Sequence, residues 1–367
     1  MDSRAAMDTV SENASPSQAH FAPQPLRFTG SGAEYFGIWI VNLLLTIVTL
    51  GIYSAWAKVR RLKYFYRHTE LAASSFDFHG SPIRILIGRV LALAMLIGYN
   101  ISVRLHSPLT LLVIVVLAIA LPWLLRNSFR FRLYNSSWRG TRFHFRGSVG
   151  ESYRVFLLNG FLTLITLYVM APFMHHQLKA YQHNNSWFGR TRFSFHARVS
   201  QFYRIYLLVL LGVVVFIIAF ISSGVVGTLA AIAQVQKHGG HVDPRAIFRT
   251  LVLFYGVAIL TVVLIAPIFH ALITNLVWNN TRLGEHRIEC NLSPIRLMWI
   301  SFSNFVLVVV TLGLFMPWAA VRLARIQVDA VTLLPASDLQ EFVAAEPETI
   351  GAVGEEAASA FDFDISL

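Results

Sequence analysis

The stretch that decides the fold runs from Tyr35 to Trp56 and reads YFGIWIVNLLLTIVTLGIYSAW. It contains no charged residue, and about 20 mostly apolar residues are enough to cross the hydrocarbon core of a bilayer. Six further stretches qualify or nearly qualify: Ile83–Val103, Leu109–Leu125, Tyr153–Phe173, Phe202–Ser223, Ile247–Ile273 and Leu297–Trp318. The sequence therefore predicts an all-α polytopic membrane protein with about seven hydrophobic helices.

The composition of the whole chain agrees with this prediction. Hydrophobic residues make up 55% of the 367 residues, charged residues only 13%, and the mean hydropathy is +0.57. A soluble globular chain carries about 25% charged residues. Cys290 is the only cysteine, so no disulfide can form within the chain.

Three of the apolar stretches carry similar residues at fixed spacing. Asn42, Asn159 and Asn304 are followed seven residues later by Thr49, Thr166 and Thr311, and eighteen residues later by Arg60, Gln177 and Arg322. This spacing predicts pseudo-repeats that start near residues 27, 143 and 287. We name these stretches A segments and the helix pairs between them B segments, which gives the order A-B-A-B-A.

Short polar segments between the apolar stretches alternate aromatic and polar residues, as in Phe76–Ser81 and Phe143–Ser148. Such alternation indicates strands with one buried face. Asn-x-x-Trp-x-Gly precedes two of them, at Asn135–Gly140 and Asn184–Gly189, and a diverged copy at Asn275–Asn280 has Asn in place of the Gly. Gly and Asn tolerate the positive φ of hairpin turns. We therefore expect short β-hairpins at Tyr64–His79, Arg132–Arg146, Gln182–His196 and Val277–Cys290.

The basic residues lie beside these hairpins, which the positive-inside rule places in the cytoplasm. Anionic lipid headgroups are the expected partners of these basic loops, and a nucleic-acid partner is not indicated. Seven simple crossings would place neighbouring hairpins on opposite sides of the membrane. One solution is that each A segment enters the membrane, breaks near its Thr-Leu pair and returns. The alternative is seven plain spans with hairpins on both faces.

Glu34–Asn42 and Thr49–Tyr64, with the string Thr-Leu-Gly-Ile-Tyr-Ser-Ala-Trp-Ala-Lys, resemble the opening of the YjgN family. The resemblance extends from about Leu26 to about Leu334. It implies a bacterial inner-membrane protein with several membrane passes, built around a domain of unknown function. It implies no activity and no catalytic residue.

The two ends of the chain differ from the middle. Residues 1–26 are rich in Ser, Ala, Pro and Gln, which predicts a disordered N-terminal tail before a membrane domain at 27–328. Residues 329–367 contain nine acidic residues and no Lys or Arg, which predicts a disordered acidic C-terminal tail. Its apolar islands, Leu339–Ala345 and Phe361–Leu367, leave open a docking motif for an unknown protein partner.

The candidate site consists of polar residues inside apolar helices: Asn42, Thr49, Asn159, Thr166, Asn304 and Thr311. Polar residues in membrane helices hold neighbouring helices together, which is the reading we favour, or they mark a transport path. No Asp or Glu lies deep in an apolar stretch, although ion-coupled carriers usually need one.

We find no catalytic constellation and predict no enzyme, no cofactor and no metal site. The adjacent residues His175 and His176 would point about 100° apart on a helix, so they do not form a pair of ligands for one metal ion. His238-Gly-Gly-His241 is interpreted as a polar turn. The first functional hypothesis is a small-molecule or lipid transporter or channel with a path along the A segments. The alternative is a membrane scaffold that binds a partner through its hairpins or acidic tail.

Overall fold

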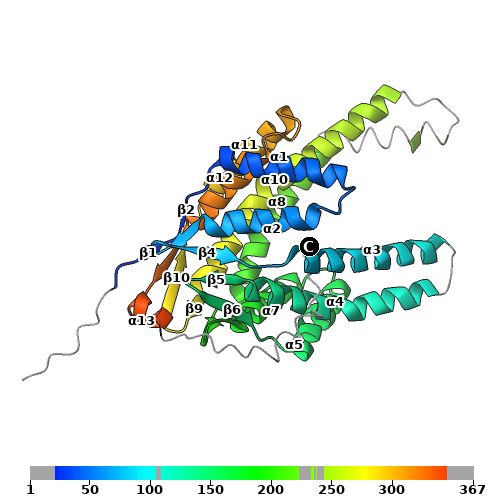
Figure 1. Cartoon of the computed structure of the whole chain (residues 1–367). Coiled ribbons are helices and arrows are strands. Elements are labelled where there is room, and N and C mark those ends of the chain that lie inside the picture. The colour runs from blue at the N-terminus through cyan, green and yellow to red at the C-terminus, as the bar shows by residue number, and fades with distance from the viewer. Residues whose placement is uncertain (1–20, 105–108, 223–232, 235–236, 238–243, 345–367) are drawn as a thin grey trace, which may run out of the picture.

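A computed structural model describes residues 21–104, 109–222, 233–234, 237 and 244–344. In this part of the chain, short antiparallel strands alternate with pairs of helices (Figure 1). Every helical pair leaves the sheet and returns to it, so the base of the molecule is a β-sheet from which all the long helices project.

The described strands form one sheet of 11 strands in the order β1-β11-β10-β9-β8-β7-β6-β5-β4-β3-β2. β1 (Gln24–Pro25) pairs with the last strand and β2 (Arg27–Phe28) with β3, so the sheet curves into an almost closed ring. Leu26, between β1 and β2, donates its backbone N–H to Val331. The other strands are β3 (Thr69–Leu71), β4 (Ser74–Phe78), β5 (Ser136–Trp138), β6 (Thr141–Phe145), β7 (Ser186–Phe188), β8 (Thr191–Phe195), β9 (Thr281–Leu283), β10 (His286–Cys290) and β11 (Val331–Leu334).

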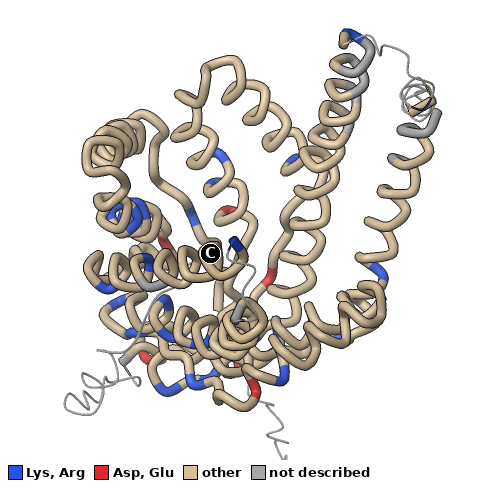
Figure 2. Tube along the Cα trace, turned by 90° about the vertical axis from the view of Figure 1, so that its right-hand side faces the viewer, with Lys and Arg blue, Asp and Glu red and all other residues tan. Residues whose placement is uncertain are grey.

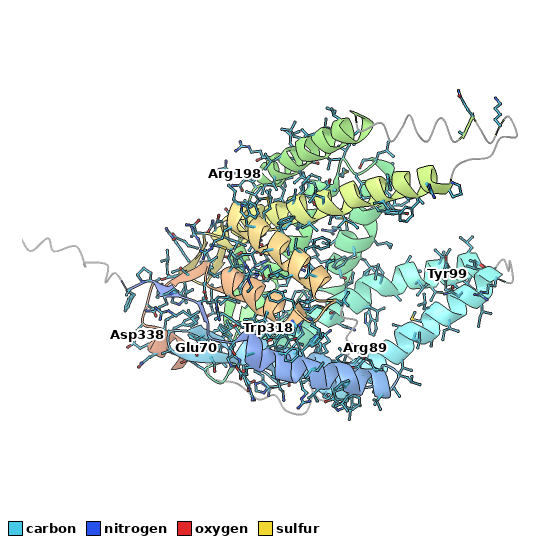
Figure 3. The ribbon with its side chains drawn as sticks, turned by 90° about the horizontal axis from the view of Figure 1, so that it is seen from above. Glu70, Arg89, Tyr99, Arg198, Trp318 and Asp338 are labelled. Atoms are coloured by element: carbon cyan, nitrogen blue, oxygen red, sulfur yellow. The ribbon has the colours of Figure 1, made fainter. Side chains whose placement is uncertain are left out.

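Five helical pairs stand between the strands in the described residues. Their bounds are α1 (Gly32–Val48) with α2 (Ser54–Arg67), α3 (Pro82–Arg104) with α4 (Leu109–Tyr134), α5 (Val149–Tyr153), the π-helical η1 (Arg154–Leu158) and α6 (Asn159–Ile165) with α7 (Ala171–Asn184), α8 (Val199–Ser222) with α10 (Pro244–Asn279), and α11 (Pro294–Val310) with α12 (Met316–Val328). Figure 3 shows Tyr99 near the outer end of the α3–α4 pair and Asp338 at the opposite end of the molecule.

The junctions between returning helices and strands share one hydrogen-bond pattern. The side chains of Asn135, Asn185 and Asn280 donate to the backbone carbonyl four residues earlier, at 2.8–3.0 Å. Their own carbonyls accept from the backbone N–H of the strand that leads into the helical pair, at His79, Arg146 and His196. These bonds satisfy backbone groups that the helix end would otherwise leave unpaired. Three of the five pairs, those that end in α4, α7 and α10, are therefore fixed to the ring in the same way.

The inside of the ring is filled by apolar side chains. Directly paired residues such as Phe76 and Trp138, Phe143 and Phe188, or Phe193 and Leu283 point to the same side because side chains alternate along a strand. They join one apolar cluster with buried residues of β3, β10 and β11. A short helix, α13 (Leu339–Ala344), contributes its buried Leu339 and its Phe342 to the same cluster.

The prediction of an all-α fold with isolated hairpins is wrong in one respect. The hairpins exist within the predicted ranges, but they pair with one another into a single sheet. The predicted diverged turn at Asn280 is also wrong, since Thr281–Leu283 is a strand and the turn begins at Gly284, where φ is +56°. In the Asn-x-x-Trp-x-Gly motif, Trp187 aligns with Trp138. Counted from the turns, Phe188 is the equivalent of Trp138, and Trp187 faces the other way, under Arg146.

The prediction of about seven helices is corrected as well. Each A segment contains an apolar helix, a sharp turn and a second, more polar helix that returns to the ring. Of the described helices, three are long and apolar enough to cross a membrane: Pro82–Arg104, Thr110–Tyr134 and Phe254–Asn279. Figure 2 shows Lys and Arg gathered around the base of the helical pairs, with the outer parts mostly uncharged. The A-B-A-B-A repeat itself stays a prediction.

The predicted disordered tails, 1–26 and 329–367, both include residues that belong to the fold. Gln24–Pro25 belongs to the sheet, as does Val331–Leu334, and Leu339–Ala344 is the helix α13. Strand pairing and the apolar cluster stabilise these segments, although their composition is that of a tail. The predicted apolar island at Phe361–Leu367 lies outside the described residues.

Candidate functional site

The turns of the three A segments have one geometry. Thr49, Thr166 and Thr311 each donate their hydroxyl to the carbonyl four residues earlier, at 2.7–2.8 Å. The same hydroxyls accept the backbone N–H four residues later, at 2.9–3.2 Å. The next residue, Leu50, Leu167 or Leu312, has a positive φ of 48–51°. The threonines therefore end one helix and start the reversal, which is a structural role.

Asn304 is buried in α11 and is bound by the returning helix α12. Arg322 donates from Nη1 to its side-chain oxygen at 2.8 Å, and its amide group donates to the carbonyl of Ala319 at 3.2 Å. Arg322 also donates to the hydroxyl of Ser303 at 3.2 Å. The guanidinium is thus held by neutral oxygens between two helices.

Asn42 has the same relationship with Arg60 of α2. Nη1 of Arg60 lies 3.4 Å from the side-chain oxygen of Asn42 and 3.0 Å from the hydroxyl of Tyr53. Asn42 is buried, whereas Arg60 is exposed on the surface of the pair. Arg89 of α3 donates to Ser54 at the start of α2, which brings a second guanidinium to the same pair.

Asn159 is buried too, but it stands apart from the other two. Its carbonyl accepts the hydroxyl of Thr163 at 2.7 Å, and the residue eighteen positions on is Gln177 rather than Arg. Around the ring, α1–α2 and α11–α12 are neighbours, because β1–β2 and β11 close the sheet. The α3–α4 pair lies between the Asn159 pair and α1–α2, and the α8–α10 pair lies between the Asn159 pair and α11–α12. The structure therefore does not bring the predicted polar residues into one site.

Charge decides what the two Arg–Asn pairs can do. Among the described residues, neither Arg60 nor Arg322 has an Asp or Glu partner. Asn42 lies about 15 Å along α1 from its first residue, at about 1.5 Å of rise per residue. A guanidinium among apolar helices is costly and usually marks a functional position. Sequence reasoning missed both arginines as site residues, although their spacing of eighteen from the asparagines pointed to them.

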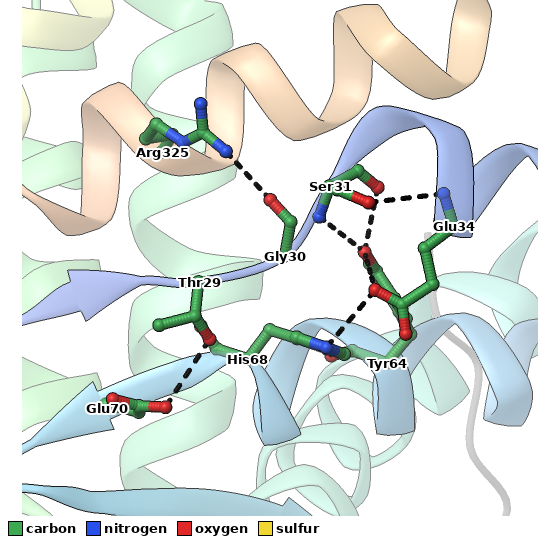
Figure 4. A network of polar contacts seen from close by, with 8 residues as sticks. All are labelled: Thr29, Gly30, Ser31, Glu34, Tyr64, His68, Glu70 and Arg325. Carbon is green, nitrogen blue, oxygen red and sulfur yellow. Dashed lines mark hydrogen bonds and ion pairs between the residues drawn. The ribbon is translucent and has the colours of Figure 1, made fainter.

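A second polar network closes the ring where its two ends meet (Figure 4). The Tyr64 hydroxyl accepts from the N–H of Ser31 at 2.9 Å and lies 3.2 Å from the Glu34 carboxylate, which is 3.5 Å from Nε2 of His68. Burial, with the nearby Glu34 carboxylate, raises the pKa of Tyr64 to about 12. Tyr64 therefore stays protonated. The network connects the start of α1 to the end of α2.

Of the two histidine pairs considered in the sequence, His175-His176 lies in the described part of the chain. His175 contacts the hydroxyl of Tyr206, while His176 contacts the carbonyl of Ala197, so the two rings point to different partners. No group of three His, Cys, Asp or Glu side chains that could hold a metal ion occurs in the described residues. His238 and His241 lie outside them.

Long apolar helices project from the ring, and Lys and Arg gather around the base of these helices. This arrangement defines a helical, membrane-associated protein. The chain belongs to a family described as bacterial protein of unknown function (DUF898), whose model matches residues 23–360. The inner membrane protein YjgN of Salmonella typhimurium is similar, with 30% identity over 132 residues, 35% of this chain and 33% of that protein. The inner membrane protein YjgN of Escherichia coli K12 is 29% identical over 123 residues, 33% of this chain and 31% of that protein.

The matched stretch thus spans about a third of the length of these curated relatives. The predicted resemblance to the YjgN family is confirmed. No solved structure matches the chain.

Proposed function

We propose that the chain is a multi-pass protein of the bacterial inner membrane. The B pairs cross the membrane, the A pairs enter it and return, and the ring with its turns lies in the cytoplasm. The names of the relatives support the compartment. The gathering of Lys and Arg at the ring supports the orientation. The 17 residues of α1 would extend about 25 Å, less than the roughly 30 Å of hydrocarbon.

In this membrane the protein is a small-molecule or lipid transporter that handles anionic headgroups or other small anions along the A pairs. The observation that carries this proposal is that Arg60 and Arg322 are held by neutral Asn side chains of the apolar helices α1 and α11. A guanidinium without a carboxylate partner can bind a phosphate or carboxylate in two hydrogen bonds. Because Arg60 is exposed on its pair, an anionic group could reach it from the lipid side.

The ring interior argues for a path beside the helices instead of through the ring. Apolar side chains from the strands fill it, and Leu339 and Phe342 of α13 pack against that layer. Charged solutes would have to displace this cluster to pass. A lipid or amphiphile moving along α1–α2 and α11–α12 would meet the arginines without crossing the ring.

The experiment is a lipid-scrambling assay with the full chain in liposomes that contain fluorescent phosphatidylglycerol. We expect Arg60→Gln and Arg322→Gln each to slow the exchange of the labelled lipid between leaflets by about tenfold, equivalent to one lost charged hydrogen bond. Arg282→Gln is the matched control, since Arg282 is exposed on β9 of the ring. Equal rates for all variants and the wild type would argue against transport along the A pairs.

A membrane scaffold is the second candidate. It is favoured by the burial of Asn42, Asn159 and Asn304, each inside its own pair, and by the filled ring. Truncation after Ala344 tests it, because this removes the acidic tail and keeps β11 and α13. A scaffold acting through the tail would lose its cross-link to a defined membrane partner, whereas a transporter would keep its lipid-exchange rate.

A further inference from the structure

Lys179 is a largely buried lysine with no counter-charge. It lies on α7, about 8 Å before the helix reaches the ring at Asn184. Among the described residues it takes part in no hydrogen bond and no ion pair, although burial withdraws its ammonium group from water. A buried charge normally has a partner, because leaving it unpaired costs free energy. The lysine therefore calls for a ligand or a functional reason.

Three histidines surround this lysine. His175 and His183 lie four residues before and after it, on the same face of α7, and His270 comes from α10. All three interact electrostatically with Lys179. The cluster thus joins two helical pairs of the ring.

Each histidine is fixed in place through one ring nitrogen. Nδ1 of His175 lies 3.0 Å from the Tyr206 hydroxyl, and Nδ1 of His183 lies 3.3 Å from that of Thr281. Nε2 of His270 lies 3.2 Å from Nε2 of Gln327 on α12. Thr281 donates its hydroxyl to the carbonyl of Val277, so Nδ1 of His183 donates to Thr281, and Nε2 of a neutral His183 is an acceptor. Nε2 of His175 makes no hydrogen bond within the described part of the chain, so it can donate to a ligand when Nδ1 accepts from the Tyr206 hydroxyl.

The sign of the charge selects the ligand. A cation would be repelled by Lys179, and no metal-binding group of three side chains is present among the described residues. No carboxylate contributes to the electrostatics of Lys179 or of the three histidines. An oxyanion would supply the missing negative charge and accept from the ammonium group and from imidazole N–H groups.

We propose that Lys179, His175 and His270 form a binding site for a phosphate group. A phosphate offers several acceptor oxygens in three dimensions, which suits donors that come from α7 and α10 together. The group is either free inorganic phosphate or the phosphate monoester of a lipid headgroup. The site is separate from the Arg60–Asn42 and Arg322–Asn304 pairs, so its failure would leave the proposed transport function untouched.

The first experiment measures the binding of inorganic phosphate to the full chain in phosphatidylcholine nanodiscs by calorimetry, with chloride holding the ionic strength constant. We expect Lys179→Met to weaken phosphate binding by at least about tenfold. Lys63→Met is the matched control, because Lys63 lies on α2, the returning helix of another A pair, and is also partly buried. The control should bind as the wild type does.

A second arm separates the two sources of the phosphate group and guards against misfolding. Nanodiscs with phosphatidic acid replace the phosphate solution, and a lipid site would show binding there that depends on Lys179. Lys179→Met should also raise the melting temperature without phosphate, since it removes an unpaired buried charge. The proposal is overturned if neither probe binds the wild type, or if Lys179→Met binds both probes as tightly as the wild type.

Discussion

The side-chain carboxylate of Asp329 accepts a hydrogen bond of 2.9 Å from the backbone N–H of Phe28, which lies 301 residues earlier in the chain. Beside it, Arg325 donates to the carbonyl of Gly30 at 2.8 Å (Figure 4). These bonds join the end of α12 to β2 and to the segment between β2 and α1. The two ends of the membrane domain are therefore held together by side chains of the last long helix and the residue that follows it.

Removing the Asp329 carboxylate should loosen this closure. We expect Asp329→Ala to lower the free energy of unfolding by about 1 kcal/mol, less than the loss of a fully buried charged hydrogen bond, because Asp329 is exposed. Asp329→Asn keeps an acceptor oxygen and should lose less. Thermal unfolding of the purified protein in detergent measures the effect. Glu285→Ala, in an exposed turn, is the control, and a loss of equal size in this variant would show that the closure is not responsible.

Much of the local structure could be predicted from the sequence. Alternating aromatics gave the hairpin positions, and the spacing between Asn42 and Thr49 led to the expectation of a break where α1 ends. Local signals of this kind depend on residues a few positions apart. The chain does reverse at all three such breaks, so both ends of each A segment lie at the ring.

The closing of the ring could not be predicted in the same way. β1 and β2 have two residues each, too few for an alternation pattern, and Gln24 pairs with Leu333 at the other end of the chain. The role of α13 depends on the apolar layer that other strands assemble. The Lys179 cluster needs α7 and α10 side by side, and no spacing in the sequence relates Lys179 to His270.

The two Arg–Asn pairs should differ in strength. The bond from Arg322 to Asn304 is 2.8 Å long and comes from a half-buried arginine, whereas the one from Arg60 to Asn42 is 3.4 Å long and comes from an exposed arginine. In double-mutant cycles with Asn→Ala and Arg→Gln, we expect a coupling free energy of about 1–2 kcal/mol for the first pair and less than about 0.5 kcal/mol for the second. Equal couplings would contradict the geometry.

Two neighbouring glycines should respond to alanine in opposite directions. A Cβ on Gly147 would lie 2.7 Å from ring carbons of Phe145 and from the hydroxyl of Tyr181, and both rings are buried. A Cβ on Gly150, within α5, would meet nothing within 4 Å. We expect Gly147→Ala to destabilise the protein by about 1–3 kcal/mol, and Gly150→Ala to stabilise it by up to about 1 kcal/mol. Thermal unfolding of both variants gives the signs.

Binding of α13 to the ring should weaken in acid. Nδ1 of buried His286 accepts the backbone N–H of Ala336 at 3.0 Å, and the His286 ring lies 4.4 Å from that of Phe342. Burial lowers the pKa of His286, with Glu285 opposing the effect. A histidine held neutral in the fold stabilises it above the unfolded pKa of about 6.5, and this contribution falls as the pH drops below that value.

Protonation would also turn the Nδ1 acceptor into a donor and break the bond to Ala336. We therefore expect hydrogen exchange at the α13 amides to become faster, relative to the intrinsic rate, between about pH 6.5 and pH 5. His286→Asn keeps an acceptor near the same place and should remove the pH dependence. A pH dependence that persists in His286→Asn would assign it to another group.

The exposed leucines at the A turns test whether the A pairs cross the membrane. Leu50, Leu167 and Leu312 are 94%, 86% and 94% exposed at the tips of their pairs, where only lipid would favour such side chains. In a Cys290→Ser background, we expect a single cysteine at each tip to resist a membrane-impermeant maleimide added from either side of sealed vesicles.

A cysteine at Glu285, in the exposed turn between β9 and β10, should react only from the cytoplasmic side and serves as the positive control. Reaction of any tip from the periplasmic side would mean that its A pair reaches through the membrane. The two arms of that pair would then be plain spans, because both ends of the pair stay at the ring. In the α1–α2 or α11–α12 pair, Arg60 or Arg322 would then lie nearer the middle of the bilayer than a re-entrant pair allows.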